Sequence, residues 1–540
     1  MKNTFKYIIG MLALVSTMFI SSCNEDELIQ ERLDDNPLPT PTVITPGTAD
    51  FTKYVSLGNS LTAGFMDGAL FPLGQRDTYA SMLGTQFAQA GGGTFVFPNT
   101  VTGNGFGGVN PDGSFRGRSS ANAAAAADPN AALSDIIEFS DGSAITPSSI
   151  PSASLNNFAV PGMRIVDATF GGYGALNPYF GGFQSSATAS VVGDAAAAGA
   201  TFFSVWLGSN DVLGYALAGG AFGEDFDPTN SSTLTSTDAF TAALSGILDA
   251  MSANGAEGLV LTIPPVTLTP FFQFVTGTEA GINLIPLDAA TAGAVNAGYS
   301  DYNDGLDAAV LLSIITTEEA TRRKVNFIEG ANRPVITDET LTVADISLAF
   351  GLPAGSVILP NTRHMEPGEL LPLTAASVLG VPADPANPTS IQGVAVPLAD
   401  QFVLTTAEQG AIILRTAQFN GIIAAQAAAR PNVNLVDIQP LFSDMFGLTT
   451  TQAALLGLSD AAQAAADGVP GLVSNGVTFV PLSLDLNAVF TSLFSTDLIH
   501  PNPRGQAFVA NEIIRVLNST YESNFEEVDP LNFPGINVAL

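Results

Sequence analysis

The chain has 540 residues, of which 46% are hydrophobic and only 12% are charged, and its net charge is −33 at neutral pH. The apolar content is sufficient for a large hydrophobic core. The negative charge argues against a nucleic-acid partner, because phosphate backbones are bound by basic side chains. With one cysteine and two histidines in the chain, we expect no cofactor and no metal centre, although a calcium ion held by loop aspartates stays open.

The first 23 residues have the pattern of a targeting segment. Lys2 and Lys6 lead into an apolar run that is short for a membrane-spanning helix and that ends at Cys23. This ending resembles the lipobox of bacterial lipoproteins, which implies lipidation of Cys23 and anchoring to a membrane. An ordinary secretory signal peptide is the alternative. Residues 24–50 are acidic and then proline-rich, which predicts a disordered tether.

A turn near the start of the mature chain carries the candidate nucleophile. The apolar run 54–57 predicts a buried strand, and Gly58 and Asn59 predict a sharp turn after it. Ser60 then stands where a helix should begin, at the carboxyl edge of a sheet and beside the positive end of a helix dipole. The alternative is that Ser60 only caps this helix.

A long stretch at about 80–155 is expected to be an insertion. It is rich in glycine, alanine and asparagine, and it carries several phenylalanines, namely Phe95, Phe97, Phe106 and Phe115. We expect either a plain loop with a short helix or a wall over the active site, which long functional loops often form.

Strands and helices alternate from residue 156 onwards. Three uninterrupted apolar runs predict strands: 158–160, 202–207 and 258–263. Helices are predicted at 186–200 and at 235–253, the second with a capping box at Thr235 and Asp238. Apolar runs of this kind indicate a parallel sheet with both faces covered. Gly162 and Asn210 follow two of these strands, where an N–H or an amide can stabilise an oxyanion.

The second half of the chain has fewer clear signals. Its expected elements are a helix from Tyr302, a strand at 325–328, an irregular stretch at 330–400 with a second insertion at about 340–400, a helix from the capping box of Thr405 and Glu408 to about 429, a strand at 432–438, a helix at 505–517 and a C-terminal tail at 525–540.

The general base must be one of the two histidines, His364 and His500. A serine nucleophile needs an imidazole to take its proton, and the imidazole needs a carboxylate to orient it. Asp497 lies three residues before His500, and Pro501 favours an extended backbone there. No carboxylate lies within three residues before His364, which makes it the weaker candidate.

Four motifs, in this order, resemble the blocks of the SGNH (GDSL-type) hydrolase family: Gly58-Asn59-Ser60-Leu61, Gly162, Gly208-Ser209-Asn210-Asp211 and Asp497-Leu498-Ile499-His500. Asn59 departs from the name-giving pattern, which has Asp. The resemblance implies a flavodoxin-like three-layer α/β/α sandwich with a parallel central sheet, spanning residues 51–524 with large insertions. It implies a catalytic triad of Ser60, Asp497 and His500. It also implies an oxyanion hole formed by Ser60, Gly162 and Asn210.

The expected function is a lipid-anchored ester hydrolase of the bacterial cell envelope. Residues 24–27 resemble the acidic stretch that sends some lipoproteins to the surface of the outer membrane. The family includes lipases, thioesterases and carbohydrate deacetylases, and the apolar insertions favour an acyl-lipid or medium-chain ester substrate. An acetyl esterase acting on acylated glycans and an inactive surface-binding protein remain alternatives.

Overall fold

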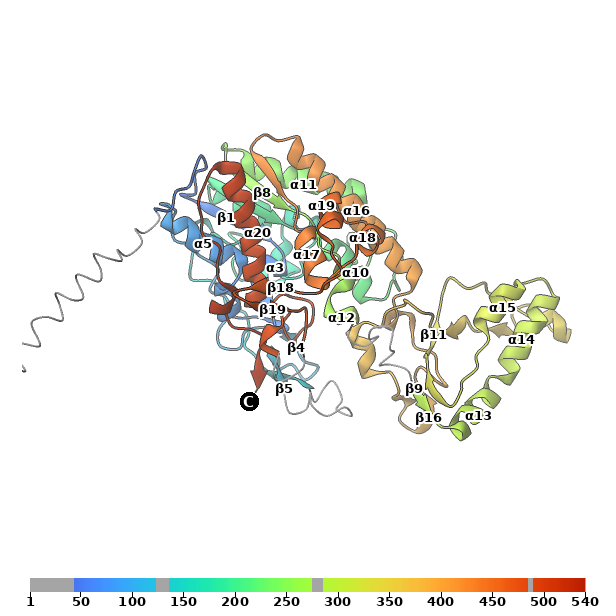
Figure 1. Ribbon diagram of the computed structural model, residues 1–540. Coiled ribbons are helices and arrows are strands. Elements are labelled where there is room, and N and C mark those ends of the chain that lie inside the picture. Colours follow the sequence, from blue (N-terminus) through green and yellow to red (C-terminus); the bar gives the residue numbers. More distant parts are fainter. Residues whose placement is uncertain (1–42, 123–135, 274–284, 484–488, 540) are drawn as a thin grey trace, which may run out of the picture. The chain divides into compact units, whose positions relative to one another are not determined.

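A parallel sheet of four strands forms the centre of the computed structural model, which describes residues 43–122, 136–273, 285–483 and 489–539 (Figure 1). The strand order is β1 (Tyr54–Gly58), β7 (Phe202–Trp206), β8 (Glu257–Leu261) and β17 (Val433–Val436). All residues of β1 and β7 are buried, which explains why their sequences are apolar without alternation. The predicted α/β class is confirmed.

The segment 156–160 runs along the free edge of β1. Phe158 N–H donates to the Ser56 carbonyl at 2.8 Å, and Val160 N–H donates to the Gly58 carbonyl at 3.0 Å. Only Asn157 forms a bridge to β1, and residues 158–160 are not part of a strand, so the strand predicted there is wrong. Pro161 has no N–H and follows at once, which leaves little length for a regular ladder.

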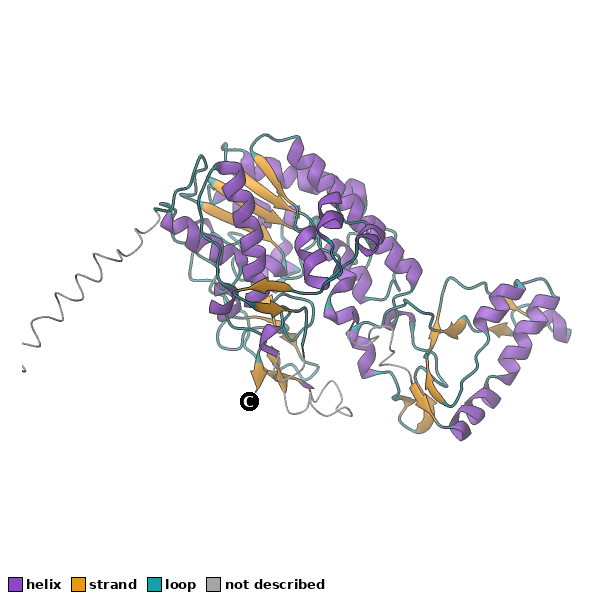
Figure 2. Cartoon of the chain, viewed as in Figure 1, coloured by secondary structure: helices purple, strands orange, loops and turns teal. Residues whose placement is uncertain are grey.

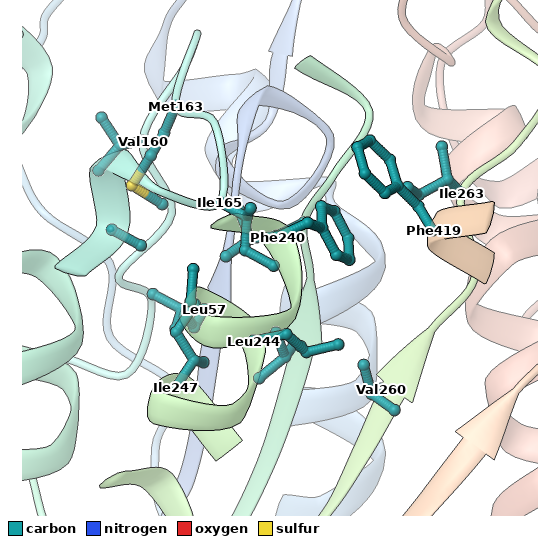
Figure 3. Close-up of a cluster of buried hydrophobic side chains, with 14 of the residues drawn as sticks. Leu57, Val160, Met163, Ile165, Phe240, Leu244, Ile247, Val260, Ile263 and Phe419 are labelled. Carbon is teal, nitrogen blue, oxygen red and sulfur yellow. The ribbon is translucent and has the colours of Figure 1, made fainter. Parts of the chain in front are cut away.

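Helices cover both faces of the sheet (Figure 2). One face packs against α9 (Val191–Ala197), α10 (Asn210–Leu217), α11 (Thr237–Ser252) and α16 (Thr406–Ala428). Figure 3 shows Leu57 and Val260 of the sheet among side chains of α11 in this layer. The opposite face packs against α5 (Tyr79–Gln89), α17 (Gln439–Phe446) and α20 (Pro503–Tyr521). The ring of Trp206 contacts Tyr79 of α5 at 5.4 Å, so this tryptophan belongs to the core, as predicted.

Local capping decides where several helices begin. Helix α16 follows the predicted capping box, in which Thr405 and Glu408 exchange hydrogen bonds. Helix α11 is capped by Ser236, whose side chain accepts from Ala239 N–H, so the capping box predicted at Thr235 and Asp238 is wrong. The helix predicted from residue 186 begins only at Val191, because the Ser190 side chain accepts from the Gly193 N–H.

Residues 285–404 contain cores of their own. Their helices and strands are β9 (Ile285–Leu287), α13 (Ala289–Gly298), α14 (Ser300–Leu311), α15 (Thr317–Arg323), β10 (Gly330–Asn332), β11 (Val335–Thr337), β12 (Ala344–Asp345), β13 (Ile358–Leu359), β14 (Thr362–His364), β15 (Pro382–Asp384) and β16 (Asn387–Ile391). The strand predicted at 325–328 is wrong. The amides of Asn303 and Asn296 accept from the N–H groups of Val325 and Phe327 at 3.0 and 2.8 Å, which satisfies this backbone without a sheet.

The first insertion builds a small second sheet. It contains β4 (Gly108–Val109), β5 (Phe115–Asn122) and β6 (Ile137–Asp141), and β20 (Val538–Ala539) pairs with β5. Phe525 is also buried, so residues 525–539 belong to the folded domain and are not the tail that the sequence predicted.

Other short elements are β2 (Phe65–Met66), β3 (Ala69–Leu70), α4 (Pro72–Arg76), α8 (Pro178–Gly181), α12 (Pro270–Gln273), α18 (Thr450–Leu455), α19 (Asp460–Ala465), β18 (Leu472–Ser474) and β19 (Val477–Phe479).

The chain divides into a unit of residues 1–45 and a unit of residues 46–540. Cys23 and the predicted tether up to residue 42 lie outside the described residues. The end of that tether, from residue 46, belongs to the second unit, where Thr48 N–H donates to the Tyr521 carbonyl at 2.8 Å. Within the described residues, no helix combines the length and the apolar character needed to cross a bilayer.

Candidate active site

Ser60 is the first residue of α3 (Ser60–Ala63), directly after β1. The cap of this helix is Asn59, whose side-chain oxygen accepts from Leu61 N–H at 3.1 Å. The interpretation of Ser60 as a simple cap is therefore wrong, and its hydroxyl is free for another partner. Gly58 is required at the turn, because a Cβ there would lie 2.1 Å from the Thr62 hydroxyl oxygen.

Asp497 and His500 lie on a tight loop before α20. Leu498 adopts a positive φ of 64°, which turns the chain back so that Ser495 N–H donates to the His500 carbonyl at 2.8 Å. Asp497 Oδ1 accepts from the backbone N–H groups of Ile499 and His500 at 3.0 and 2.9 Å. The backbone of the loop itself thereby fixes the position of the Asp497 carboxylate.

The structure brings Ser60, His500 and Asp497 together, although 440 positions separate Ser60 from His500. His500 Nε2 lies 2.8 Å from Ser60 Oγ, and His500 Nδ1 lies 2.9 Å from Asp497 Oδ2. Asp497 Oδ2 also accepts from Gly68 N–H at 3.0 Å. This is the hydrogen-bond chain of nucleophile, base and orienting carboxylate that serine hydrolases use.

Asp497 keeps its negative charge although it is buried. Burial alone would raise its pKa, but the neighbouring His500 and the hydrogen bonds from His500 and Gly68 lower the pKa to about 2. The carboxylate is therefore ionised across the neutral range, where it accepts the Nδ1–H of His500 and leaves Nε2 facing Ser60 as a proton acceptor.

Asp67 supports this loop from the turn between β2 and β3, and sequence reasoning did not find it. Its Oδ1 accepts from the N–H and hydroxyl of Thr496 at 3.1 and 3.0 Å, and its own N–H donates to Ser495 Oγ at 3.0 Å. Burial and the charge of Asp497 raise the pKa of Asp67 to about 6. The only sequence signal was the turn-forming pair Asp67 and Gly68.

Asn210 is held beside the same site at the start of α10. Its amide donates one hydrogen to the Met163 carbonyl at 3.0 Å, which connects it to the turn that contains Gly162. Gly162 itself is exposed, has a positive φ of 78° and does not line the pocket next to Ser60. Asp211, the next residue of α10, is fully buried and accepts from Ile165 N–H at 2.9 Å, and burial raises its pKa to about 7.

His364 is engaged elsewhere. Its Nδ1 lies 2.9 Å from the Arg333 carbonyl and its Nε2 accepts from Asn326 N–H at 3.1 Å, so neither nitrogen is left for a nucleophile. Burial lowers its pKa. These contacts give His364 a structural role on β14, which agrees with the expectation that it is a weaker candidate than His500 for the general base.

A mainly apolar pocket opens at Ser60 and His500. The space between its walls is about 460 Å³, a volume that includes open solvent at its mouth. Its apolar lining consists of Leu61, Leu213, Pro264, Pro265, Val266, Phe442, Phe494, Ile499 and Pro501, and its polar lining consists of Ser60, Ser209, Asn210, Thr269 and His500.

The predicted phenylalanine wall does not form this pocket. None of Phe95, Phe97, Phe106 and Phe115 is among its lining residues. Phe95 stacks on Tyr54 at 5.4 Å, and Phe106 joins a separate small cluster with Ala63 and Leu70. The loops after β8 and before α20 provide most of its apolar surface instead, a role that no periodic pattern revealed.

Among the described residues, one group of carboxylates lies close enough together to hold a metal ion, and it consists of Glu339, Asp400 and Glu408. None of these lines the pocket at Ser60.

No protein-family model, no curated protein and no solved structure matches this chain.

Proposed function

We propose that this protein is a serine ester hydrolase in which Ser60, His500 and Asp497 form the catalytic triad. The observation that carries the proposal is the continuous hydrogen-bond chain from Asp497 through His500 to Ser60 Oγ, which ends at an apolar pocket. A buried serine that serves only packing does not need an imidazole oriented by an ionised carboxylate. Motif resemblance and geometry thus support the same three residues.

The reaction follows from the positions of these groups. Ser60 Oγ attacks the ester carbonyl while His500 Nε2, at 2.8 Å, takes its proton. Asp497 stabilises the imidazolium that forms. His500 then gives the proton to the leaving alcohol, and water, activated by the same imidazole, releases the acyl group from Ser60.

The oxyanion requires donors that are already oriented. Ser60 lies at the start of α3, where its N–H has no partner within the helix. The second amide hydrogen of Asn210 is available after the first is given to the Met163 carbonyl. We assign Gly162 N–H as a third donor, on the motif resemblance and on the link from its turn to Asn210.

The strand order supports an SGNH-type fold. If the segment 156–160 is counted as the second strand, the order across the sheet is 2-1-3-4-5, with all neighbours parallel. This is the flavodoxin-like order of doubly wound folds, in which ligands bind outside the carboxyl ends of the strands where the order reverses. Ser60 follows the first strand, at that reversal.

The pocket favours an acyl chain as the part of the substrate that it holds. Most of its lining is apolar, and each CH₂ group transferred from water contributes about 0.8 kcal/mol. Esters of medium-chain or longer acids are the proposed substrates, and acylated glycans are the alternative. A lipid anchor at Cys23 would place the enzyme at the outer membrane, where both kinds of ester occur.

A panel of p-nitrophenyl esters from acetate to palmitate, assayed with the wild type and with Ser60→Ala, tests this proposal. We expect turnover in the variant to fall by about three or more orders of magnitude. Ser519→Ala, an exposed serine on α20, is the matched control and should retain full activity. Unchanged hydrolysis by Ser60→Ala would refute the assignment.

A further inference from the structure

Three acidic side chains meet beside the start of α16, away from the pocket at Ser60. Glu339 lies in the turn that follows β11, Asp400 opens a short 3-10 turn, and Glu408 lies in the first turn of α16. One carboxylate oxygen from each lies within 4.8 Å of the other two. Within the described part of the chain, none of the three forms an ion pair with a lysine or arginine.

Two of these carboxylates have buried oxygens without a hydrogen-bond partner. Glu408 is only 5% exposed, and its Oε2 accepts from the N–H and hydroxyl of Thr405, both at 2.7 Å. Its other oxygen, Oε1, is buried and unpartnered, and so is Asp400 Oδ1. A buried carboxylate oxygen is unfavourable unless a donor or a cation meets it.

The backbone after α10 leaves room for these oxygens. Gly220 has a positive φ of 78°, and a Cβ at this position would lie 2.0 Å from Glu408 Oε1. At the preceding Gly219, a Cβ would lie 2.4 Å from the Asp400 carbonyl oxygen. Two glycines thus let the loop after α10 come close to the acidic group without covering it.

The cations beside Asp338 are engaged with other carboxylates. Arg322 pairs with Asp338 and Glu366, and Arg363 pairs with Asp338 and Glu369, rather than with this group.

We propose that Glu339, Asp400 and Glu408 bind one Ca²⁺ ion. All the side-chain donors are carboxylate oxygens, which suit hard cations, and the absence of histidine or cysteine from the group disfavours zinc and copper. Ca²⁺ accepts irregular sets of six to eight oxygens, whereas Mg²⁺ requires a smaller and nearly octahedral arrangement. The ion would join the turn after β11 and the 3-10 turn at Asp400 to the first turn of α16.

Isothermal titration of the EDTA-treated full-length protein with CaCl₂, and separately with MgCl₂, tests the proposal. We expect one Ca²⁺ site and clearly weaker Mg²⁺ binding. Changes to residues that only orient metal ligands already weaken binding about 10- to 100-fold, so Glu408→Gln and Asp400→Asn should each weaken Ca²⁺ binding by about tenfold or more. Glu526→Gln, at an exposed position of the same unit, is the control and should bind as the wild type does.

Thermal unfolding provides a second measurement. A Ca²⁺ concentration about 100 times the wild-type Kd should raise the Tm of the wild type by about 2–3 °C, and at the same concentration the rise should be about half of that or less in the two variants. Glu339→Gln changes an exposed residue and keeps the test valid if a buried variant fails to fold. Absence of Ca²⁺ binding to the wild type, equal binding of Mg²⁺, or binding that persists in every variant would overturn the proposal.

Discussion

Replacing Asp67 with Asn should stabilise the protein at neutral pH but not in acid. Asp67 is buried beside Asp497, and its pKa rises from 3.8 to about 6 in the folded state. One pKa unit corresponds to about 1.36 kcal/mol, so ionised Asp67 destabilises the folded state by about 3 kcal/mol. Asn cannot ionise, and its side-chain oxygen can still accept from the N–H and hydroxyl of Thr496.

The sign of the pH dependence follows from which state binds the proton more tightly. Below about pH 4 both the folded and the unfolded states hold the proton, and the native carboxyl carries no penalty. Between about pH 4 and pH 6 the unfolded state loses its proton first, so the stability of the wild type falls as the pH rises, and above about pH 6 the penalty is constant. The advantage of Asp67→Asn should therefore grow from near zero at pH 4 to its full value at pH 7.

The assay is the difference in Tm between the variant and the wild type from pH 4 to pH 8. An unfolding entropy of about 2.1 cal/mol/K per residue over residues 46–540 makes 3 kcal/mol equivalent to about 3 °C. Asp304→Asn, at an exposed position on α14, is the control and should show no such growth with pH. A Tm difference for Asp67→Asn that is the same at every pH, or that is negative at pH 7, would refute the reasoning.

Three further variants test the site itself. Asp497→Asn should lower kcat by about 10⁴, because the His500 tautomer that accepts from Ser60 is no longer favoured; an unchanged kcat on p-nitrophenyl butyrate would remove Asp497 from the triad. Asn210→Ala should lower kcat by about 10²–10³ with little change in KM, as expected for a donor to the oxyanion; a change in KM alone would assign Asn210 to substrate binding. Val266→Trp places a large ring in the pocket that Val266 lines, so kcat/KM for octanoate should fall much more than for acetate; an equal loss for both esters would contradict an acyl pocket at this position.

The parts of the site that depend on short-range sequence were predictable. Ser60 follows a breaker pair after an apolar strand, and Asp497 and His500 lie on one loop three residues apart, so motif spacing was sufficient to propose them. The capping box of Thr405 and Glu408 is equally local, and the structure confirms it. Asn210 also lies where its motif indicated, beside the pocket at Ser60.

The remaining features depend on contacts between distant segments. Asp67 reaches Thr496 across 429 positions, and no local pattern predicts such a hydrogen bond. The pocket uses Val266 and Phe494 from connecting segments that show no periodicity, and Phe442 from α17, whereas the sequence pointed to phenylalanines of the first insertion. The strand predicted at 325–328 was wrong because Asn296 and Asn303 satisfy that backbone from helices that precede it.

The central claim is that Ser60 is a nucleophile activated by His500. Its most direct test is labelling of the folded protein with a fluorophosphonate probe, followed by mapping of the modified peptide. We predict rapid stoichiometric labelling at Ser60, strong slowing in His500→Ala and no labelling in Ser60→Ala. A folded wild-type protein that does not react, as an inactive surface-binding protein would not, or that reacts at a different serine, would contradict the account.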